Sequence, residues 1–118
     1  MLAHVRAASP GMPILYTNCH PFRSGQFAFM HNGAVPSFKK LRRALQQNLS
    51  DEVFCGIEGT TDSEHIFAMI LNEMTRVERS SEQPLGPARL SEVVKRVVQA
   101  LCALMKQHGV QEAASLNM

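Results

Sequence analysis

The dipeptide Asn32-Gly33 is the feature that most constrains the fold of this chain. Asn-Gly between apolar residues is the strongest short-range signal for a tight β-hairpin turn. The stretch before the pair, residues 27–31 with the sequence FAFMH, is typical of a short buried strand. The stretch after it does not resemble a second strand, because Pro36 opens a segment whose apolar residues recur every three or four positions. The pair is therefore predicted to end a core strand in a turn that leads into a helix.

The spacing of apolar residues predicts the helices of the chain. Three are expected, over residues 36–50, from about residue 62 to residue 77, and over residues 90–108. Thr61 or Asp62 can cap the second helix, and Gly109 is a natural stop for the third. The polar stretch 78–87 between the two long helices is predicted to be a mobile loop.

Short extended segments account for much of the remaining chain. They are predicted at residues 2–8, 14–22 and 27–31, with turns at 9–13 and 23–26. The last residues, AASLNM, look like a strand that has only begun. The predicted fold class is α+β, in one domain over residues 1–118. Because the first element begins at residue 2 and the last is unfinished at residue 118, the chain is expected to be a fragment.

Composition narrows the classes of partner. The chain is 45% hydrophobic and 19% charged, and its formal net charge is +2, which is too small to predict a nucleic-acid or membrane partner. No apolar run approaches the roughly 18 residues of a membrane span, and the N-terminus carries no signal-peptide pattern. Three cysteines without C-x-x-C spacing favour free thiols in a reducing compartment, so a cytoplasmic location is expected.

Histidines and basic residues could indicate other functions. The candidate metal ligands are His4, His20, His31, His65 and Cys19. No pair of these histidines has helical i, i+4 spacing and no H-E-x-x-H or C-x-x-C motif occurs, so neither a metal nor another cofactor is expected. Cys19 is predicted to be a buried, inert thiol rather than a nucleophile. The basic run over residues 39–43 is interpreted as the solvated face of the first helix.

Four motifs together suggest a family. They are HVRAASPG at residues 4–11, NCHPF at 18–22, FMHNG at 29–33 and GTTDSE at 59–64. In this order and approximate spacing they resemble the type-2 glutamine amidotransferases of the N-terminal-nucleophile hydrolase superfamily. The likeness is closest to the stand-alone branch that includes the fungal subunit for glutathione breakdown. The resemblance implies a partial αββα sandwich, truncated at both ends.

The resemblance also implies a site for a free amino acid. Arg6 matches the clamp for the α-carboxylate, with Ser9 as a neighbouring hydroxyl, because a guanidinium can donate two parallel hydrogen bonds. Asp62 matches the residue that receives the α-ammonium group. Asn32 and Gly33 match the oxyanion hole, where the Asn side-chain amide and the Gly N–H stabilise the developing charge. Singly, Arg6 would be a surface charge and Asp62 a helix cap.

The nucleophile that the family requires is not found in the sequence. The family mechanism uses a cysteine at the mature N-terminus, whose own α-amine moves the proton. Position 1 is Met and position 2 is Leu, and the cysteines at positions 19, 55 and 102 are internal. The chain is therefore expected to be inactive as written, with His20 and His31 shaping the site without a catalytic role. The implied partners are glutamine or a γ-glutamyl compound, as in glutathione catabolism, and a partner subunit. The alternative is a non-catalytic interaction or regulatory module that keeps the fold.

Overall fold

The computed structural model describes residues 15–80 and 85–118. The predicted strand at 2–8, the turn at 9–13, and the site residues Arg6 and Ser9 lie outside the described residues. The described elements are, in order, η1 (Tyr16–Asn18), β1 (Phe22–Ser24), β2 (Phe27–Phe29), β3 (Asn32–Ala34), α1 (Phe38–Gln46), α2 (Asp51–Cys55), α3 (Asp62–Arg79), α4 (Pro87–Gln107) and β4 (Ser115–Asn117). The mixture of helices and small sheets agrees with the predicted α+β class.

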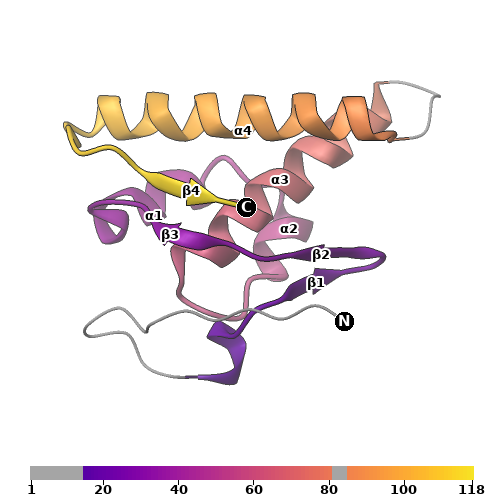
Figure 1. Cartoon of the computed structure of the whole chain (residues 1–118), viewed down its shortest axis with the longest axis horizontal. Helices are drawn as coiled ribbons and strands as arrows, with labels where there is room; N and C mark the ends of the chain where they lie inside the picture. Colours follow the sequence, from indigo (N-terminus) through magenta and orange to yellow (C-terminus); the bar gives the residue numbers. More distant parts are fainter. Residues whose placement is uncertain (1–14, 81–84) are drawn as a thin grey trace.

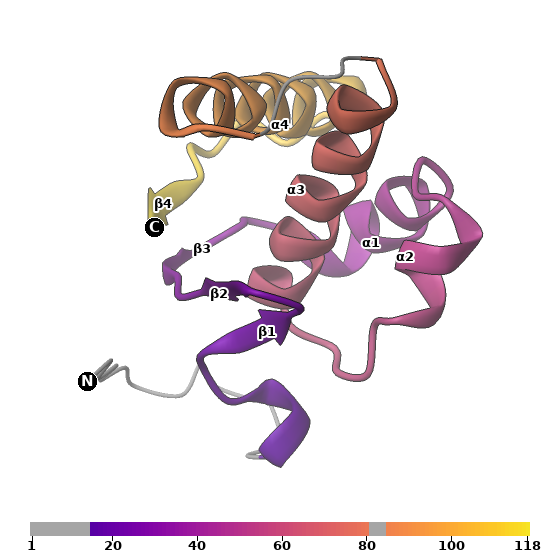
Figure 2. The same ribbon diagram turned by 90° about the vertical axis from the view of Figure 1, so that its right-hand side faces the viewer.

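Helix α3 is the centre of the arrangement. It contacts α1, α2 and α4. The short strands lie on one side of α3 and helices α1 and α2 lie on the other (Figure 2). Helix α4 crosses above this layer and β4 returns beneath it towards β3 (Figure 1). A strand near residue 33 and a strand at the C-terminal end of the chain therefore meet beside the start of α3.

The strands form two antiparallel pairs. β1 and β2 are joined by a tight turn in which Gly25 has a φ of 54°, a left-handed conformation that glycine adopts without steric cost. This hairpin confirms the turn predicted at residues 23–26. β3 pairs with β4, with Gly33 opposite Leu116. The strand expected in the last residues of the chain is thus confirmed.

The prediction of a turn at Asn32-Gly33 is wrong. Both residues belong to β3, because residues 115–117 supply a partner strand from the far end of the sequence. The change of direction comes later, at Ser37, whose φ of 53° is left-handed and which precedes the first residue of α1. Pro36 is consequently not the first helical residue. A local turn signal was overridden by a long-range strand pairing.

The first predicted helix, over residues 36–50, is shorter in the structure, and a helix that was not predicted follows it. α1 ends at Gln46, and Ser50 begins the separate helix α2 by accepting a hydrogen bond from the Val53 N–H (3.4 Å). The other two helices are confirmed. Thr61 caps α3 by accepting from the Glu64 N–H (3.2 Å), as predicted, and α4 starts at Pro87 and ends before Gly109. Since α3 continues to Arg79, the connection is shorter than the predicted loop 78–87, and its residues 81–84 lie outside the described part.

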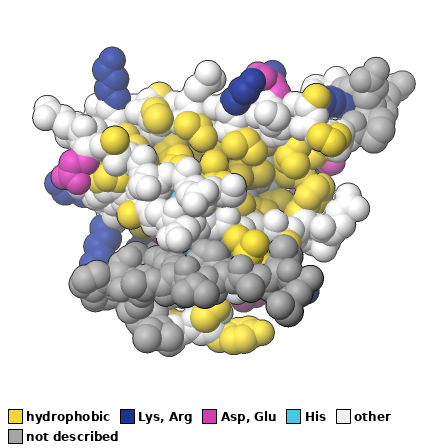
Figure 3. Space-filling model, viewed as in Figure 1, with side chains coloured by type: hydrophobic (Ala, Val, Ile, Leu, Met, Phe, Trp, Pro, Cys, Tyr) yellow, Lys and Arg dark blue, Asp and Glu magenta, His cyan; other side chains and the backbone are white. Residues whose placement is uncertain are grey.

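The core lies where α3 meets its neighbours. Its buried apolar residues are Phe22, Phe29, Val35, Phe38, Leu41, Leu45, Ile66, Phe67, Ile70, Met74, Val93, Val97, Leu101 and Met105. Further hydrophobic side chains gather in a band below α4 on the face shown in Figure 3. Cys19 is not part of the core. It is exposed, like Cys55 and Cys102, so the prediction that it is a buried thiol is wrong.

Candidate active site

Strand β3 brings the predicted oxyanion residues against β4. Gly33 leaves no room for a side chain, because a β-carbon there would clash with the Ser115 carbonyl and lie 2.9 Å from Nε2 of His31. Glycine is therefore required at this position by close packing rather than by a positive φ angle. The preceding Asn32 is exposed. Its side-chain amide can donate hydrogen bonds to a ligand on this surface.

Asp62 ties the start of α3 to the end of β3. The Val35 N–H donates to Asp62 Oδ2 (2.9 Å), and the Ser63 N–H donates to Asp62 Oδ1 (2.8 Å). The carboxylate is 5% exposed and lies in the first turn of α3, where the helix dipole favours negative charge. The Asp62 carboxylate is thus bonded to a backbone N–H that lies two residues after Gly33. Each of its oxygens keeps acceptor capacity beyond the bond named here.

His31 is fully buried beside this junction. Its Nδ1 lies 2.9 Å from Ser63 Oγ, and its Nε2 lies 3.2 Å from the Ser115 carbonyl oxygen. His20 contacts Phe22 edge-on, with ring centroids 4.8 Å apart. Both histidines therefore pack on the strands that precede the helices, and neither lies on a helix.

The loop before α3 is held by acceptor side chains. Glu64 accepts from the Glu58 N–H through Oε1 and from the Gly59 N–H through Oε2, each at 2.8 Å. Asn18 Oδ1 accepts from the Thr60 N–H (3.1 Å). A β-carbon at Gly59 would lie 2.5 Å from Asn18 Oδ1 and 2.7 Å from Glu64 Oε2, so this turn also requires glycine. The position of Asp62 is fixed by these bonds as well as by α3.

His65 connects α1 to the first turn of α3. Its Nδ1 donates to the Thr61 carbonyl (2.7 Å), since a carbonyl can only accept. Its Nε2 is then free of hydrogen in the neutral ring and accepts from the Gln46 side-chain amide (2.9 Å). The Phe38 ring packs edge-on against it at 5.1 Å. With its hydrogen on Nδ1, the His65 ring thus links the end of α1 to the first turn of α3.

Burial lowers the pKa of His65 below its usual 6.5. Arg42 lowers this pKa further, while the hydrogen bond to the Thr61 carbonyl and the charges of Glu64 and Asp62 raise it. The cost of burying the charged ring is the largest effect. The ring is consequently neutral in the folded chain near pH 7.

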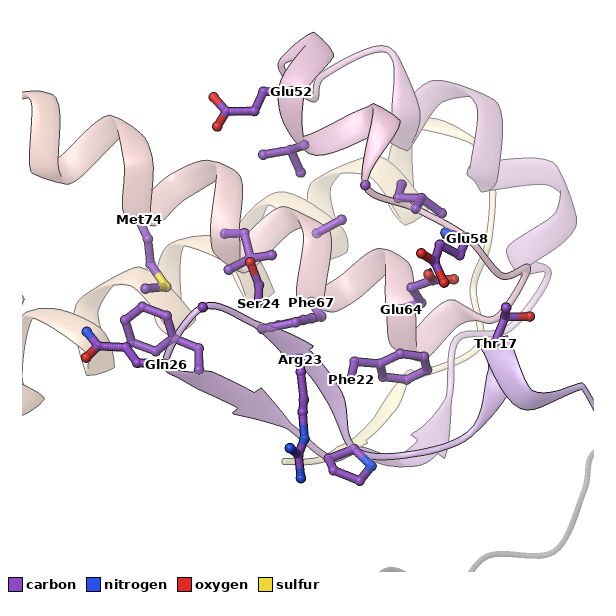
Figure 4. Close-up of a pocket in the computed structure, with 18 of the residues that line it drawn as sticks. Thr17, Phe22, Arg23, Ser24, Gln26, Glu52, Glu58, Glu64, Phe67 and Met74 are labelled. Carbon is purple, nitrogen blue, oxygen red and sulfur yellow. Dashed lines mark hydrogen bonds between the residues drawn. The ribbon is translucent and has the colours of Figure 1, made fainter.

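A large cavity lies between the β1–β2 hairpin, α2 and α3 (Figure 4). It has a volume of about 1130 Å³, and the described residues that line it include none of Asn32, Gly33 and Asp62. In Figure 4, Glu58 and Glu64 lie near one another at one end and Met74 lies at the other. Since both Glu64 oxygens already bind the loop backbone, this carboxylate serves the loop before α3.

The structure therefore brings part of the predicted site together. Asn32, Gly33 and Asp62 lie around the junction of β3 and α3, and His31 packs against the same glycine. Sequence reasoning did not assign roles to Ser63 and Glu64, although T-x-x-E at residues 61–64 is the signature of a capped helix start. Among the described residues, no group of three or more His, Cys, Asp or Glu side chains is arranged to hold a metal ion.

Comparison with known proteins identifies the family. The family of class-II glutamine amidotransferases matches residues 1–114. The chain belongs to this family. The resemblance drawn from the four motifs is thus confirmed. Asn32, Gly33, Asp62, Arg6 and Ser9 all fall within the matched residues.

Individual relatives of this amidotransferase chain include a fungal protein. The probable glutamine amidotransferase DUG3 of Saccharomyces cerevisiae is 33% identical over 96% of this chain and 32% of its own length. The glutamine–fructose-6-phosphate aminotransferase of Bradyrhizobium diazoefficiens is 32% identical over 75% of this chain and 14% of its own. The chain thus spans about a third of the length of the fungal relative.

A solved structure supports the same assignment. A glutamine aminotransferase class-II domain protein from Silicibacter pomeroyi superimposes with a TM-score of 0.60 and 28% sequence identity. The match covers 77% of this chain and 37% of that protein. In the described part of our chain, no helix has the length and hydrophobicity needed to cross a bilayer.

Proposed function

We propose that this chain forms the amino-acid-binding half of a glutaminase-type domain. Asp62 receives the α-ammonium group of glutamine or of a γ-glutamyl compound, and Arg6 and Ser9 hold its α-carboxylate. The Asn32 side-chain amide and the Gly33 N–H donate to the oxyanion that forms on the side-chain amide. The observation that carries this proposal is the 2.9 Å hydrogen bond from the Val35 N–H to Asp62 Oδ2. It puts a carboxylate next to the strand that bears both donors.

The proposed chemistry is acyl transfer through a thioester. An N-terminal cysteine attacks the amide carbon, ammonia leaves, and water then releases the acid. The chain supplies binding and oxyanion groups for this reaction, and its internal cysteines have no free α-amine to act as the base. We therefore propose that the 118-residue chain on its own binds substrate without turning it over. In a chain that carries such a cysteine, for which we propose the αββα sandwich, the same groups would serve catalysis.

The cellular context of the proposal follows from the fungal relative and from the cysteines. Similarity to a probable glutamine amidotransferase of yeast favours glutamine as the substrate. The resemblance of the four motifs to the branch for glutathione breakdown extends the proposal to a γ-glutamyl compound. A partner subunit is proposed on the same resemblance. The cysteines at 19, 55 and 102 are all exposed and unpaired, which suits the reducing cytoplasm.

Titration with L-glutamine tests the binding site. We expect isothermal calorimetry to show binding of L-glutamine by the 118-residue chain and none of D-glutamine. Asp62→Asn should weaken binding about 10- to 100-fold, since a hydrogen bond to a charged group contributes about 1.5–3 kcal/mol. Glu52→Gln, at an exposed position of α2, is the matched control and should leave affinity unchanged.

Thermal melts and an ammonia assay complete the test. Asp62→Asn also removes an acceptor from the Val35 or the Ser63 N–H, so its melting temperature must be followed alongside its affinity. A chain that keeps its fold and ignores L-glutamine would overturn the proposed site. Ammonia release above a buffer blank would contradict the proposed inactivity. Both the proposal and the alternative of a non-catalytic module predict that L-glutamine binds without release of ammonia. A chain extended by an N-terminal segment that begins with cysteine separates the two, because only the proposal predicts that this chain releases ammonia.

A further inference from the structure

A buried series of hydrogen bonds joins β4 to the first turn of α3. It runs from the Ser115 carbonyl through the His31 ring to Ser63 Oγ, with distances of 3.2 and 2.9 Å. His31 and Ser63 are both 0% exposed. A buried polar side chain is costly unless it is hydrogen-bonded, so this series determines how the strand pair and the helix fit together.

The acceptor at one end determines the tautomer of the ring. The Ser115 carbonyl can only accept, so Nε2 of His31 carries the hydrogen. In the neutral ring Nδ1 is then an acceptor, and the Ser63 hydroxyl donates to it. The direction of both bonds is therefore defined. The ring acts as a rigid spacer with a donor at one end and an acceptor at the other.

The two ends of the series touch the two halves of the proposed site. A β-carbon at Gly33 would lie 2.9 Å from His31 Nε2, which means that the ring lies directly against the oxyanion residue. At the other end, the Ser63 N–H donates to Asp62 Oδ1 (2.8 Å), and Ser63 Oγ lies 3.5 Å from the same oxygen. His31 thus contacts Gly33 and, through Ser63, the carboxylate.

The strand that bears Gly33 is also connected to Asp62 directly, by a bond that does not involve His31. The Val35 N–H bonds directly to Asp62 Oδ2, and this bond holds one of the two carboxylate oxygens. The Ser63 N–H bonds the other oxygen, Oδ1, and Ser63 Oγ, which bonds the His31 ring, lies 3.5 Å from the same oxygen. Holding both oxygens orients the plane of the Asp62 carboxylate. A binding group that is misoriented towards its substrate reduces catalysis strongly.

We propose that His31 and Ser63 are positioning residues of the substrate site. The ring, with its hydrogen on Nε2, sets the spacing between Gly33 and Asp62, and Ser63 transmits it to the carboxylate. The inference rests on the proposed function for the part that concerns glutamine. The coupling between Gly33 and Ser63 is a property of the unliganded chain and is tested separately.

The first experiment uses the unliganded chain. Long-range ¹H–¹⁵N correlation spectra should show His31 in the Nε2–H tautomer, with His31→Gln used to assign its signals. In Ser63→Ala, the backbone amide signal of Gly33 should shift. In Thr75→Ala, which removes another hydroxyl hydrogen bond of α3, to the Leu71 carbonyl (3.0 Å), the Gly33 signal should stay in place. An Nδ1–H tautomer, or a Gly33 amide that ignores Ser63→Ala, would overturn the coupling.

The second experiment measures L-glutamine affinity in the same variants. Ser63→Ala should weaken binding about 3- to 10-fold, the loss expected for one hydrogen bond. Ser63→Thr, which keeps the hydroxyl, should restore part of this loss, and Thr75→Ala should bind as the unaltered chain does. Equal weakening in Ser63→Ala and Thr75→Ala would show a general loss of stability and would refute the positioning role. No binding by the unaltered chain would contradict the proposed function, while the tautomer and the Gly33 shift would still decide the coupling.

Discussion

At the scale of single residues, His65 makes stability depend on pH. Burial lowers its pKa in the folded chain below 6.5, so from about pH 6.5 downward the unfolded chain binds a proton that the folded chain does not. The free energy of unfolding must then fall with decreasing pH. The limiting slope for one proton is about 1.4 kcal/mol per pH unit. Above pH 6.5 both states are neutral at this residue, and its contribution is constant.

Chemical denaturation at pH 7.5 and pH 5.5 checks this expectation. The unaltered chain should lose more stability on acidification than His65→Gln, in which no imidazole titrates at this position. His108→Gln, at the exposed C-terminal cap of α4, should keep the pH dependence of the unaltered chain. Identical pH dependence in the unaltered chain and in His65→Gln would show that His65 is not the source.

Residue identities were predictable where the chemistry is local. Thr61 or Asp62 was expected to cap α3, and Thr61 does so through a bond that closes within three residues. The partners of His31 were not predictable, because Ser63 and Ser115 lie 32 and 84 positions away in the sequence. The exposure of Cys19 was missed for a similar reason. Burial depends on which elements cover a residue, and a single sequence does not state this.

At the scale of elements, the start of α3 depends on Glu64. This carboxylate is 8% exposed, and its two oxygens accept from the Glu58 and Gly59 N–H groups. Glu64→Gln leaves one acceptor oxygen and turns an NH₂ group towards a backbone donor. We expect a loss of about 2 kcal/mol in the free energy of unfolding, since hydrogen bonds to buried charged groups contribute about 1.5–3 kcal/mol.

Urea denaturation of Glu64→Gln measures that loss. Glu78→Gln is the matched control, because it makes the same change near the exposed C-terminal end of the same helix. Its effect should lie within about 0.5 kcal/mol of zero. A Glu64→Gln chain as stable as the control would show that the loop at residues 58–60 holds its position without this carboxylate.

Element type was more predictable than element boundaries. The long stripes of α3 and α4 carry enough periodicity to be recognised, and both helices were expected. The end of α1 at Gln46 was not expected, because the apolar spacing continues through Leu49. Helix α2 was not expected either, although Ser50 is a good N-cap. β3 was mistaken for a turn, since its pairing partner lies at the other end of the chain.

At the scale of the whole molecule, α4 presents apolar side chains on more than one face. Its buried stripe consists of Val93, Val97, Leu101 and Met105. A small cavity of about 370 Å³ between α1, α3 and α4 follows one flank of this stripe, next to Arg96 and Ala100. At 100° per residue, Val94 and Val98 lie on the opposite flank, and both are only half-buried. They add to the apolar surface of α4, and hydrophobic side chains gather in a band below this helix in Figure 3.

An apolar band of this kind favours association. We expect the isolated chain to self-associate in light scattering as its concentration rises, and to unfold over a broad temperature range. Val94→Lys combined with Val98→Lys should shift the population towards monomer, because a buried ammonium opposes contact between the bands. Gln99→Lys, at an exposed position about 100° around the same helix from Val98, adds charge on a different face from the two valines and should not produce this shift. A monodisperse monomer with a sharp melting transition would contradict the expectation. It would show that the folded chain is stable with its apolar band exposed to water.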